Sequence, residues 1–144
     1  MLTNLPGAES NRIVVRFKNG NILKGLTRDF VPEKPKFHLT HPDERIEEID
    51  TETLKAVFFV KSYDGDKGHQ DAKGFSYVDP VTFRGMKIKV TFQDNETIYG
   101  STMGYNKNRK GFFILPADPE SNNIRIYVVA SAIKEVKLGS QAET

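Results

Sequence analysis

The side chains that most often carry acid–base or metal chemistry are spread thinly along this sequence. Its three histidines are His38, His41 and His69. Because successive strand residues alternate between faces, His38 and His41 would point to opposite sides of a strand. The segment 64–68 (DGDKG) begins like a calcium-binding loop, but Phe75 stands at the twelfth loop position, where an EF-hand carries a glutamate. We therefore predict a solvated linker here, with no bound metal and no other cofactor.

A run of acidic residues in the first half is the other candidate for catalysis. No neighbouring histidine, serine or lysine constellation gives these carboxylates a reaction. We interpret the run as a solvated strand edge that discourages edge-to-edge association, and the alternative is a negatively charged docking face for a basic partner. The chain also has no cysteine, phosphate-binding loop or nucleophile elbow, so we expect a protein that is not an enzyme. The acidic residues are Glu44, Glu47, Glu48, Asp50 and Glu52.

Basic and aromatic residues gather in one loop of the second half. Lys107, Arg109 and Lys110 lie close to Tyr105 in the sequence. This combination suits single-stranded nucleic acid, because cations neutralise phosphates while rings stack on bases. The net charge of +2 is too small to indicate a polyanionic partner by itself. Binding of RNA or single-stranded DNA through these four residues is therefore the alternative function.

Two pairs of adjacent phenylalanines, at 58–59 and 112–113, offer a different kind of surface. Adjacent strand residues face opposite sides, so one ring of each pair must find cover outside its own core. We expect the two halves of the chain to pack against each other through these outward rings, and the alternative is a hydrophobic surface for another chain or a second copy. The residues predicted to contact a protein partner are Phe59, Phe113, Tyr99, Tyr127 and, in a stiff loop, Asn122.

The elements that hold these side chains are predicted to be short β-strands. Alternating apolar residues predict a strand at 13–17, and Asn19-Gly20 supplies a tight turn into the next strand, 22–30. Gly25 in the middle of that strand permits a bend or a close backbone approach. No segment shows helical periodicity over a useful length, so the predicted fold class is all-β. The other strands are expected at 37–39, 46–49, 54–60, 88–92, 97–105, 111–115, 124–129 and 133–138.

The two halves of the sequence resemble each other. The segment 13–17 aligns with 88–92, and 54–57 aligns, after a short gap, with 133–136. This predicts an internal duplication that gives two tandem five-stranded antiparallel barrels, each too small to be stable without the other. The predicted organisation is a flexible N-terminus at 1–11, a first unit at 12–61, a linker at 62–84, a second unit at 85–139 and a flexible tail at 140–144.

A bent second strand in a five-stranded unit resembles the Sm-like and SH3-like barrels, and the chain as a whole resembles a tandem pair of them. Phe17-Lys18-Asn19-Gly20 and the segment 55–60 are also similar to bacterial domains of unknown function that accompany signalling and motility systems. RNA-binding Sm proteins pair an aspartate and an asparagine in one loop with an arginine-glycine or lysine-glycine pair near strands four and five. Asp29-Phe30 matches part of the first motif, but no asparagine follows at the required distance and no arginine-glycine occurs at strand four, so the RNA pocket of that family does not carry over.

The bulk composition is that of a globular protein. The chain has 144 residues, of which 38% are hydrophobic and 28% charged. No stretch approaches the ~18 apolar residues of a membrane span, and residues 1–11 lack the features of a signal peptide, so we expect a cytoplasmic protein without a membrane partner. We predict a binding module, an adaptor or regulatory domain for a protein partner, and a homo-oligomer remains open.

Overall fold

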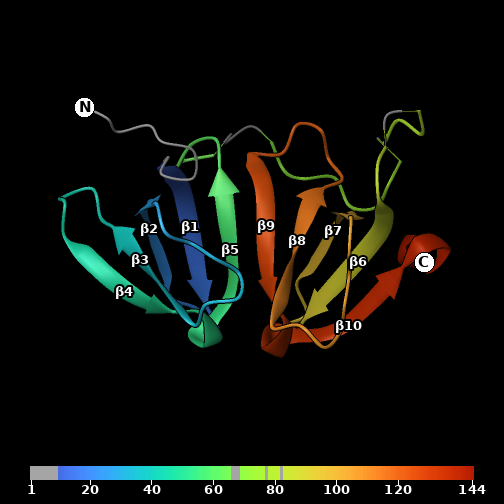
Figure 1. The fold of residues 1–144 in the computed structure, drawn as a ribbon. Coiled ribbons are helices and arrows are strands. Elements are labelled where there is room, and N and C mark those ends of the chain that lie inside the picture. The colour runs from blue at the N-terminus through green and yellow to red at the C-terminus, as the bar shows by residue number, and fades with distance from the viewer. Residues whose placement is uncertain (1–9, 66–68, 77, 82) are drawn as a thin grey trace.

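The computed structural model describes residues 10–65, 69–76, 78–81 and 83–144. Within these residues, ten antiparallel strands form one open sheet (Figure 1), which confirms the all-β prediction. The strands are β1 (Asn11–Phe17), β2 (Ile22–Thr27), β3 (Lys36–Thr40), β4 (Ile46–Asp50), β5 (Leu54–Val60), β6 (Met86–Phe92), β7 (Thr97–Thr102), β8 (Gly111–Pro116), β9 (Asn123–Val129) and β10 (Ile133–Leu138). Three short 3₁₀ helices accompany them: η1 (Thr51–Thr53), η2 (Ala130–Ala132) and η3 (Gly139–Glu143).

The order of strands across the sheet is β10-β6-β7-β8-β9-β5-β1-β2-β3-β4. Each half of the chain therefore has the same internal order, its last strand followed by its first to fourth strands. The halves join where β9 pairs with β5. Because β5 also pairs with β1, and β9 with β8, neither strand has a side left to close its own half. Among the described residues β4 does not pair with β5, nor β10 with β9, so the two closed barrels that we predicted are not found.

The core is divided between two hydrophobic clusters on opposite faces of the shared strands. β5 is buried at every position, and its adjacent rings separate: Phe59 lies in the cluster of the first half and Phe58 in that of the second. On β8, Phe112 lies in the second cluster while Phe113 packs against the first. As the sequence predicted, the outward rings lie between the two halves.

Two glycines allow neighbouring strands to approach closely. A Cβ atom on Gly25 of β2 would lie 2.4 Å from the Thr40 carbonyl oxygen of β3, and one on Gly100 of β7 would lie 2.2 Å from the Leu115 carbonyl oxygen of β8. Such distances are too short for any Cβ atom, so only glycine fits at these two positions, each in the second strand of its half. The close approach that the sequence predicted at Gly25 is confirmed.

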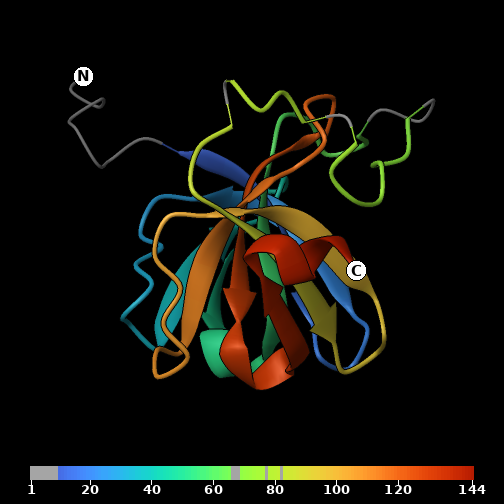
Figure 2. The same cartoon turned by 90° about the vertical axis from the view of Figure 1, so that its right-hand side faces the viewer.

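The two ends of the described chain differ. The segment 140–144, predicted as a flexible tail, forms most of η3 (Figure 2), where Ala142 is fully buried and the Thr144 carbonyl accepts a hydrogen bond from Lys89 Nζ at 3.1 Å. The predicted flexible N-terminus lies almost wholly outside the described residues, and β1 begins at Asn11. Among the residues that the structure describes, no helix has the length and apolarity needed to cross a membrane.

Candidate functional site

The sheet ends at two strands that pair on one side only, and these two ends are the candidate functional site. β4 pairs with β3, and β10 pairs with β6 (Figure 1). On their other sides neither strand has a partner in the described part of the chain. We call these sides the β4 edge and the β10 edge. Unpaired backbone N–H and C=O groups make such an edge a template for a further strand.

The free backbone groups of β4 follow from the hydrogen bonds that it makes. Residues of an antiparallel strand bond alternately to one neighbour and to the other. The His41 N–H donates to the Arg45 carbonyl at 2.8 Å, so Arg45 and every second residue after it face β3. The backbone groups of Ile46 and Glu48 therefore point outward along the β4 edge.

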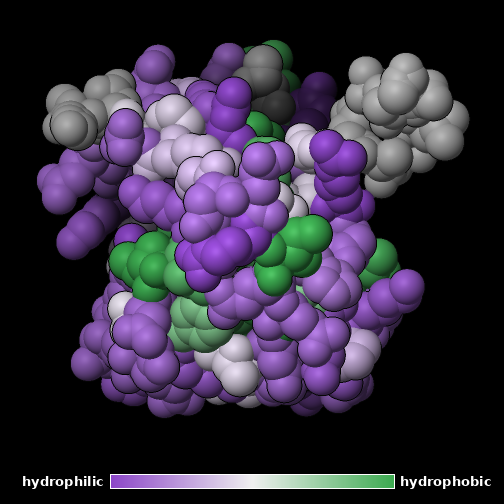
Figure 3. Space-filling view, turned by 90° about the vertical axis from the view of Figure 1, so that its left-hand side faces the viewer, coloured by the Kyte–Doolittle hydropathy of each residue, from purple (hydrophilic) through white to green (hydrophobic). Residues whose placement is uncertain are grey.

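The β4 edge is acidic, with apolar groups between the charges. The side chains of Glu47 and Glu48 are about half exposed, Ile46 is 69% exposed, and only Ile49 is buried. Glu47 bonds to His41 Nε2 at 2.8 Å, and Glu48 bonds to Lys36 Nζ at 3.4 Å. Viewed from this end of the sheet, the surface is mostly hydrophilic with separate hydrophobic groups (Figure 3). An edge of this kind attracts a segment that carries positive charge.

A histidine–aspartate pair lies on the strand next to this edge. His38 Nδ1 lies 2.6 Å from Asp29 Oδ2, and the His38 backbone N–H donates to the other Asp29 oxygen at 2.9 Å. The bond to Asp29 raises the pKa of His38. Burial would raise the pKa of Asp29, but the bonds from His38 outweigh it and lower that pKa. The pair ties the loop before β3 to the strand.

The β10 edge carries the opposite charge pattern. Lys134 and Lys137 flank Glu135 and Val136 on this strand. Lys134 Nζ donates to Asn95 Oδ1 at 3.0 Å, and Lys137 Nζ donates to Thr144 Oγ1 at 3.3 Å. Neither lysine lies in an ion pair within the described residues, so neither charge is neutralised by a carboxylate there.

A buried lysine at the junction of the halves was missed by the sequence analysis. Lys55 on β5 has a side chain only 8% exposed, and its Nζ bonds to Asp94 at 2.7 Å and to Glu96 through a short contact. The ammonium also lies 4.8 Å from the centre of the Phe92 ring. The bond from Lys55 lowers the pKa of Asp94. These contacts fasten the turn between β6 and β7 to the first half.

The predicted protein-interface residues are all engaged within the chain. Phe59 is 3% exposed, and Phe113 lies 6.0 Å from it, ring centre to ring centre. Tyr127 is buried and its hydroxyl donates to the Pro32 carbonyl at 3.2 Å, while Tyr99 packs against Phe75. Asn122, in the loop between β8 and β9, forms hydrogen bonds with Ser62 through its side chain. None of the four rings forms an exposed apolar surface of the isolated chain.

Arg125 covers two phenylalanine rings of the first-half cluster and was also missed by the sequence analysis. Its guanidinium carbon lies 4.3 Å from the centre of the Phe59 ring and 4.6 Å from that of Phe113. Burial lowers the pKa of Arg125, and no carboxylate pairs with it among the described residues. The sequence signal was present, because an arginine inside an otherwise apolar strand must cover its neighbours with its stem and guanidinium face.

The predicted nucleic-acid residues separate around a hollow of about 580 Å³ beside β7 and β8. Tyr105 and Arg109 line it, whereas Lys107 and Lys110 point into solvent outside it. Arg109 pairs with Glu33 at 2.7 Å, and Tyr105 packs edge-on against Phe112. The structure thus brings two of the four together and gives one of them an acidic partner.

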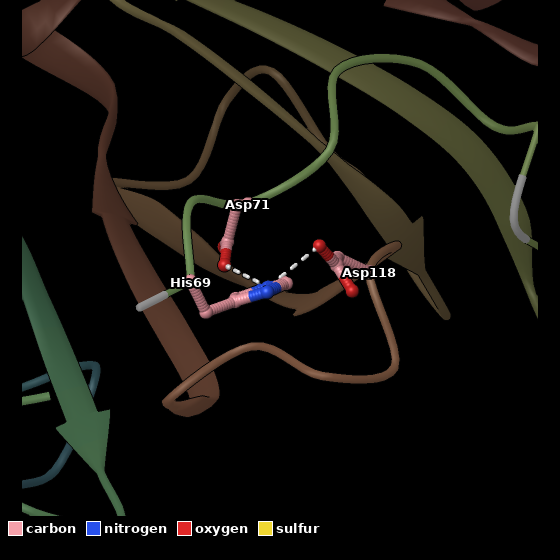
Figure 4. A group of neighbouring side chains, drawn as sticks. All are labelled: His69, Asp71 and Asp118. Atoms are coloured by element: carbon pink, nitrogen blue, oxygen red, sulfur yellow. Dashed lines mark hydrogen bonds and ion pairs between the residues drawn. The ribbon is translucent and has the colours of Figure 1, made fainter. Parts of the chain in front are cut away.

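A group of metal-type ligands forms on the predicted linker. His69, Asp71 and Asp118 offer ligand atoms within 4.8 Å of one another (Figure 4). The Asp118 carboxylate, however, already accepts three hydrogen bonds: from the Ala72 N–H at 2.7 Å, from the Glu120 N–H at 2.8 Å and from His69 at 2.9 Å. Burial would raise the pKa of Asp118, but these bonds outweigh it and lower that pKa. We interpret the group as a structural contact that holds the described part of the linker against the loop between β8 and β9.

Comparison with known proteins identifies one family model. The model described as "Family of unknown function (DUF6982)" matches residues 9–140. No curated protein and no solved structure matches the chain significantly.

Proposed function

The chain belongs to the family of unknown function DUF6982, and we propose that it is a non-enzymatic binding module that takes up an extended segment of a protein partner at the edge of its sheet. The observation that carries this proposal is the unpaired β4 edge at the end of a ten-stranded sheet. A strand that adds to such an edge gains main-chain hydrogen bonds, while alternate side chains provide specificity.

The chemistry of the β4 edge supports a basic partner segment. Ile46 and Glu48 present free backbone groups, and Glu47 and Asp50 add negative charge beside them. An incoming strand with basic residues would neutralise these carboxylates, and an apolar residue on it would cover the exposed Ile46. Among the described residues, His38 with Asp29 and His69 with Asp118 hold loops in place, which supports a role in binding rather than catalysis.

We further propose that the two halves descend from one duplicated barrel-like unit. The proposal is supported by the identical strand order of the halves, by the matching glycines at positions 25 and 100, and by a 3₁₀ helix before the last strand of each half. The chain then differs from two separate barrels because β5 and β9, which would each close their own half, pair with each other instead.

Hydrogen exchange with peptides tests the binding proposal. The protein is incubated with an extended peptide of alternating lysine and valine or with the matching glutamate–valine peptide. We expect the basic peptide alone to slow exchange of the Ile46 and Glu48 amides. Glu48→Pro removes an outward N–H without breaking a bond to β3, so it should weaken binding about fivefold, as expected for one lost hydrogen bond.

The matched control is Glu48→Gln, which removes the charge and keeps the N–H. It should weaken binding less than Glu48→Pro does. If neither peptide protects the amides of β4 or of β10, the sheet edges are not a binding site and the proposal is wrong.

Single-stranded nucleic acid is the second candidate ligand class. It is favoured by the exposure of Lys107 and Lys110 near Tyr105, and disfavoured by the Glu33 carboxylate that pairs with Arg109. Anisotropy titration with mixed-sequence RNA at low salt tests it. Binding that disappears on changing Lys107 and Lys110 to alanine would support it, and no binding at low salt would exclude it.

A further inference from the structure

We propose that the partner strand at the β4 edge is β10 of a second copy, so that copies of this chain associate head to tail. This inference rests on the proposed function and names its partner. The junction inside the chain already shows this kind of contact, because it pairs the fourth strand of one half, β9, with the last strand of the other, β5. The two strands left unpaired are the counterparts of these: β4 is the fourth strand of its half, and β10 is the last strand of its half.

The internal repeat predicts the register of the new contact. The alignment that places Leu54 on Ile133 also places η1 on η2, and continued backward it places Ile46 on Arg125. In the junction, Phe59 pairs with Arg125, Phe58 with Ile126, and Val57 with Tyr127. Transferred to the free edges, this register sets Leu138 against Ile46, Lys137 against Glu47, and Val136 against Glu48.

The backbone hydrogen bonds agree with this register. The Phe92 N–H donates to the Glu96 carbonyl, so Phe92 and every second residue before it bond toward β7. The residues between them bond toward β10, where their partners are Glu135 and Lys137. The backbone groups of Val136 and the N–H of Leu138 are therefore free, whereas the Leu138 carbonyl belongs to the first turn of η3. In the transferred register these groups lie opposite the free backbone groups of Glu48 and Ile46.

The side chains of the two edges are also complementary. Lys137 and Glu47 form a non-hydrogen-bonded pair in this register, the kind in which opposite side chains lie closest. Leu138 opposite Ile46 covers an isoleucine that is 69% exposed in the single copy. Pairing of like edges is disfavoured, because two β4 strands would bring Glu47 and Glu48 of one copy against acidic residues of the other.

The expected association is weaker than the junction within the chain. Phe58 and Tyr127, both buried at the junction, correspond to Lys137 and Glu48 at the free edges, so much less apolar surface is covered. Opposite charges carry more of the contact, and added salt should weaken it. Because the contact joins a β4 edge to a β10 edge, an assembly of any length still has one free β4 edge and one free β10 edge. The product is a ring if the rotation between neighbouring copies closes, and a filament if it does not.

Sedimentation velocity of the 144-residue chain, from ~10 μM to ~1 mM and at low and high salt, tests the proposal. We expect the mean mass to grow with concentration and to fall with salt. Glu47→Lys or Lys137→Glu should each weaken association about tenfold, because an attractive cross-strand pair becomes a repulsive one. Mixing the two variants should restore association, since every edge of one then meets an opposite charge on the other.

The charge-matched controls lie away from both edges. Glu120→Lys and Lys61→Glu change exposed residues outside the strands and should associate like the unmodified chain. Circular dichroism melts check folding, because Glu47 also contacts His41 and Lys137 contacts Thr144. A chain that stays monomeric at every concentration, or variants that fail to complement each other, would overturn the proposal. The edge-binding function would still stand in that case if the basic peptide protects β4, and both would fail if no ligand protects either edge.

Discussion

Replacing Lys55 by methionine measures how strongly the ion pairs fasten the two halves of this sheet. The lysine lies on β5, and the carboxylates that it binds, Asp94 and Glu96, belong to the turn between β6 and β7 of the other half. Methionine has a stem of similar length that keeps the packing against Phe92 while it removes the charge. The substitution therefore isolates the electrostatic contribution.

The structure predicts a moderate loss. The side chains of Asp94 and Glu96 stay 57% and 43% exposed, so solvent limits each pair to ~1 kcal/mol or less. The attraction between the ammonium and the Phe92 ring adds ~0.5–1 kcal/mol. Part of this total is offset, because methionine no longer carries the cost of holding a charge away from water. Glu96 also keeps its ion pair with Arg16 at 3.3 Å. The net destabilisation is expected to be ~1 kcal/mol, which lowers the Tm by ~4 °C for a chain of this length.

Urea unfolding of a double-mutant cycle with Asp94→Asn provides the assay. We expect a coupling free energy between Lys55 and Asp94 of ~0.5–1 kcal/mol that decreases with added salt. Lys134→Met is the matched control, because this lysine occupies the corresponding position of β10 but is exposed, and its loss should change stability by less than ~0.5 kcal/mol. A coupling energy near zero, or equal effects at positions 55 and 134, would refute the reasoning.

Three further predictions follow from contacts within the sheet and its loops. Gly25→Ala and Gly100→Ala should each destabilise the protein by more than ~2 kcal/mol in urea, whereas Gly104→Ala, whose Cβ meets nothing within 4 Å, should have little effect. The pKa of Asp118 is lowered in the folded protein, so the stabilisation from its ionised form is complete above its unfolded pKa and is lost as pH falls through the lower folded value. Asp118→Asn should therefore reduce the pH dependence of stability below about pH 4, which an acid titration followed by circular dichroism measures. Arg125→Ala should cost ~1–2 kcal/mol and increase binding of an apolar dye to the uncovered Phe59 and Phe113, and unchanged dye binding would contradict the covering role.

The positions of the strands could be predicted because they depend on local sequence. Alternating apolar residues and the Asn19-Gly20 turn are signals within a few residues of one another, and the structure has a strand in every predicted segment. The joining of β5 to β9 could not be predicted in this way, since it depends on which strand sides remain available after folding. One signal did point to it: 54–60 is apolar on both faces, as a strand with two neighbours and two covered faces requires, whereas 133–138 alternates with charge.

The candidate site was accessible to sequence analysis only in part. The acidic run was assigned to a strand edge, and Glu47 and Glu48 do lie on the terminal strand of the sheet. The pairing of Lys55 with Asp94 was not visible, since a lysine in a strand gives no sign of a partner in a distant turn. Likewise, the contact of His69 with Asp118 joins residues that are remote in the sequence, and no local pattern predicts it.

The sharing of β5 and β9 also has a consequence for the order in which the protein is made. The hydrophobic cluster of the first half includes Tyr127 and Val129, which are synthesised near the end of the chain. While the ribosome is still translating the second half, the β5 face that carries Ala56, Phe58 and Val60 lacks its cover, because the rest of the buried cluster on that face comes from the second half. The first half therefore cannot finish folding as an independent intermediate, and the nascent chain exposes Phe58 until the second half leaves the ribosome. Translation stalled before residue 123 should yield a chain that depends on chaperones.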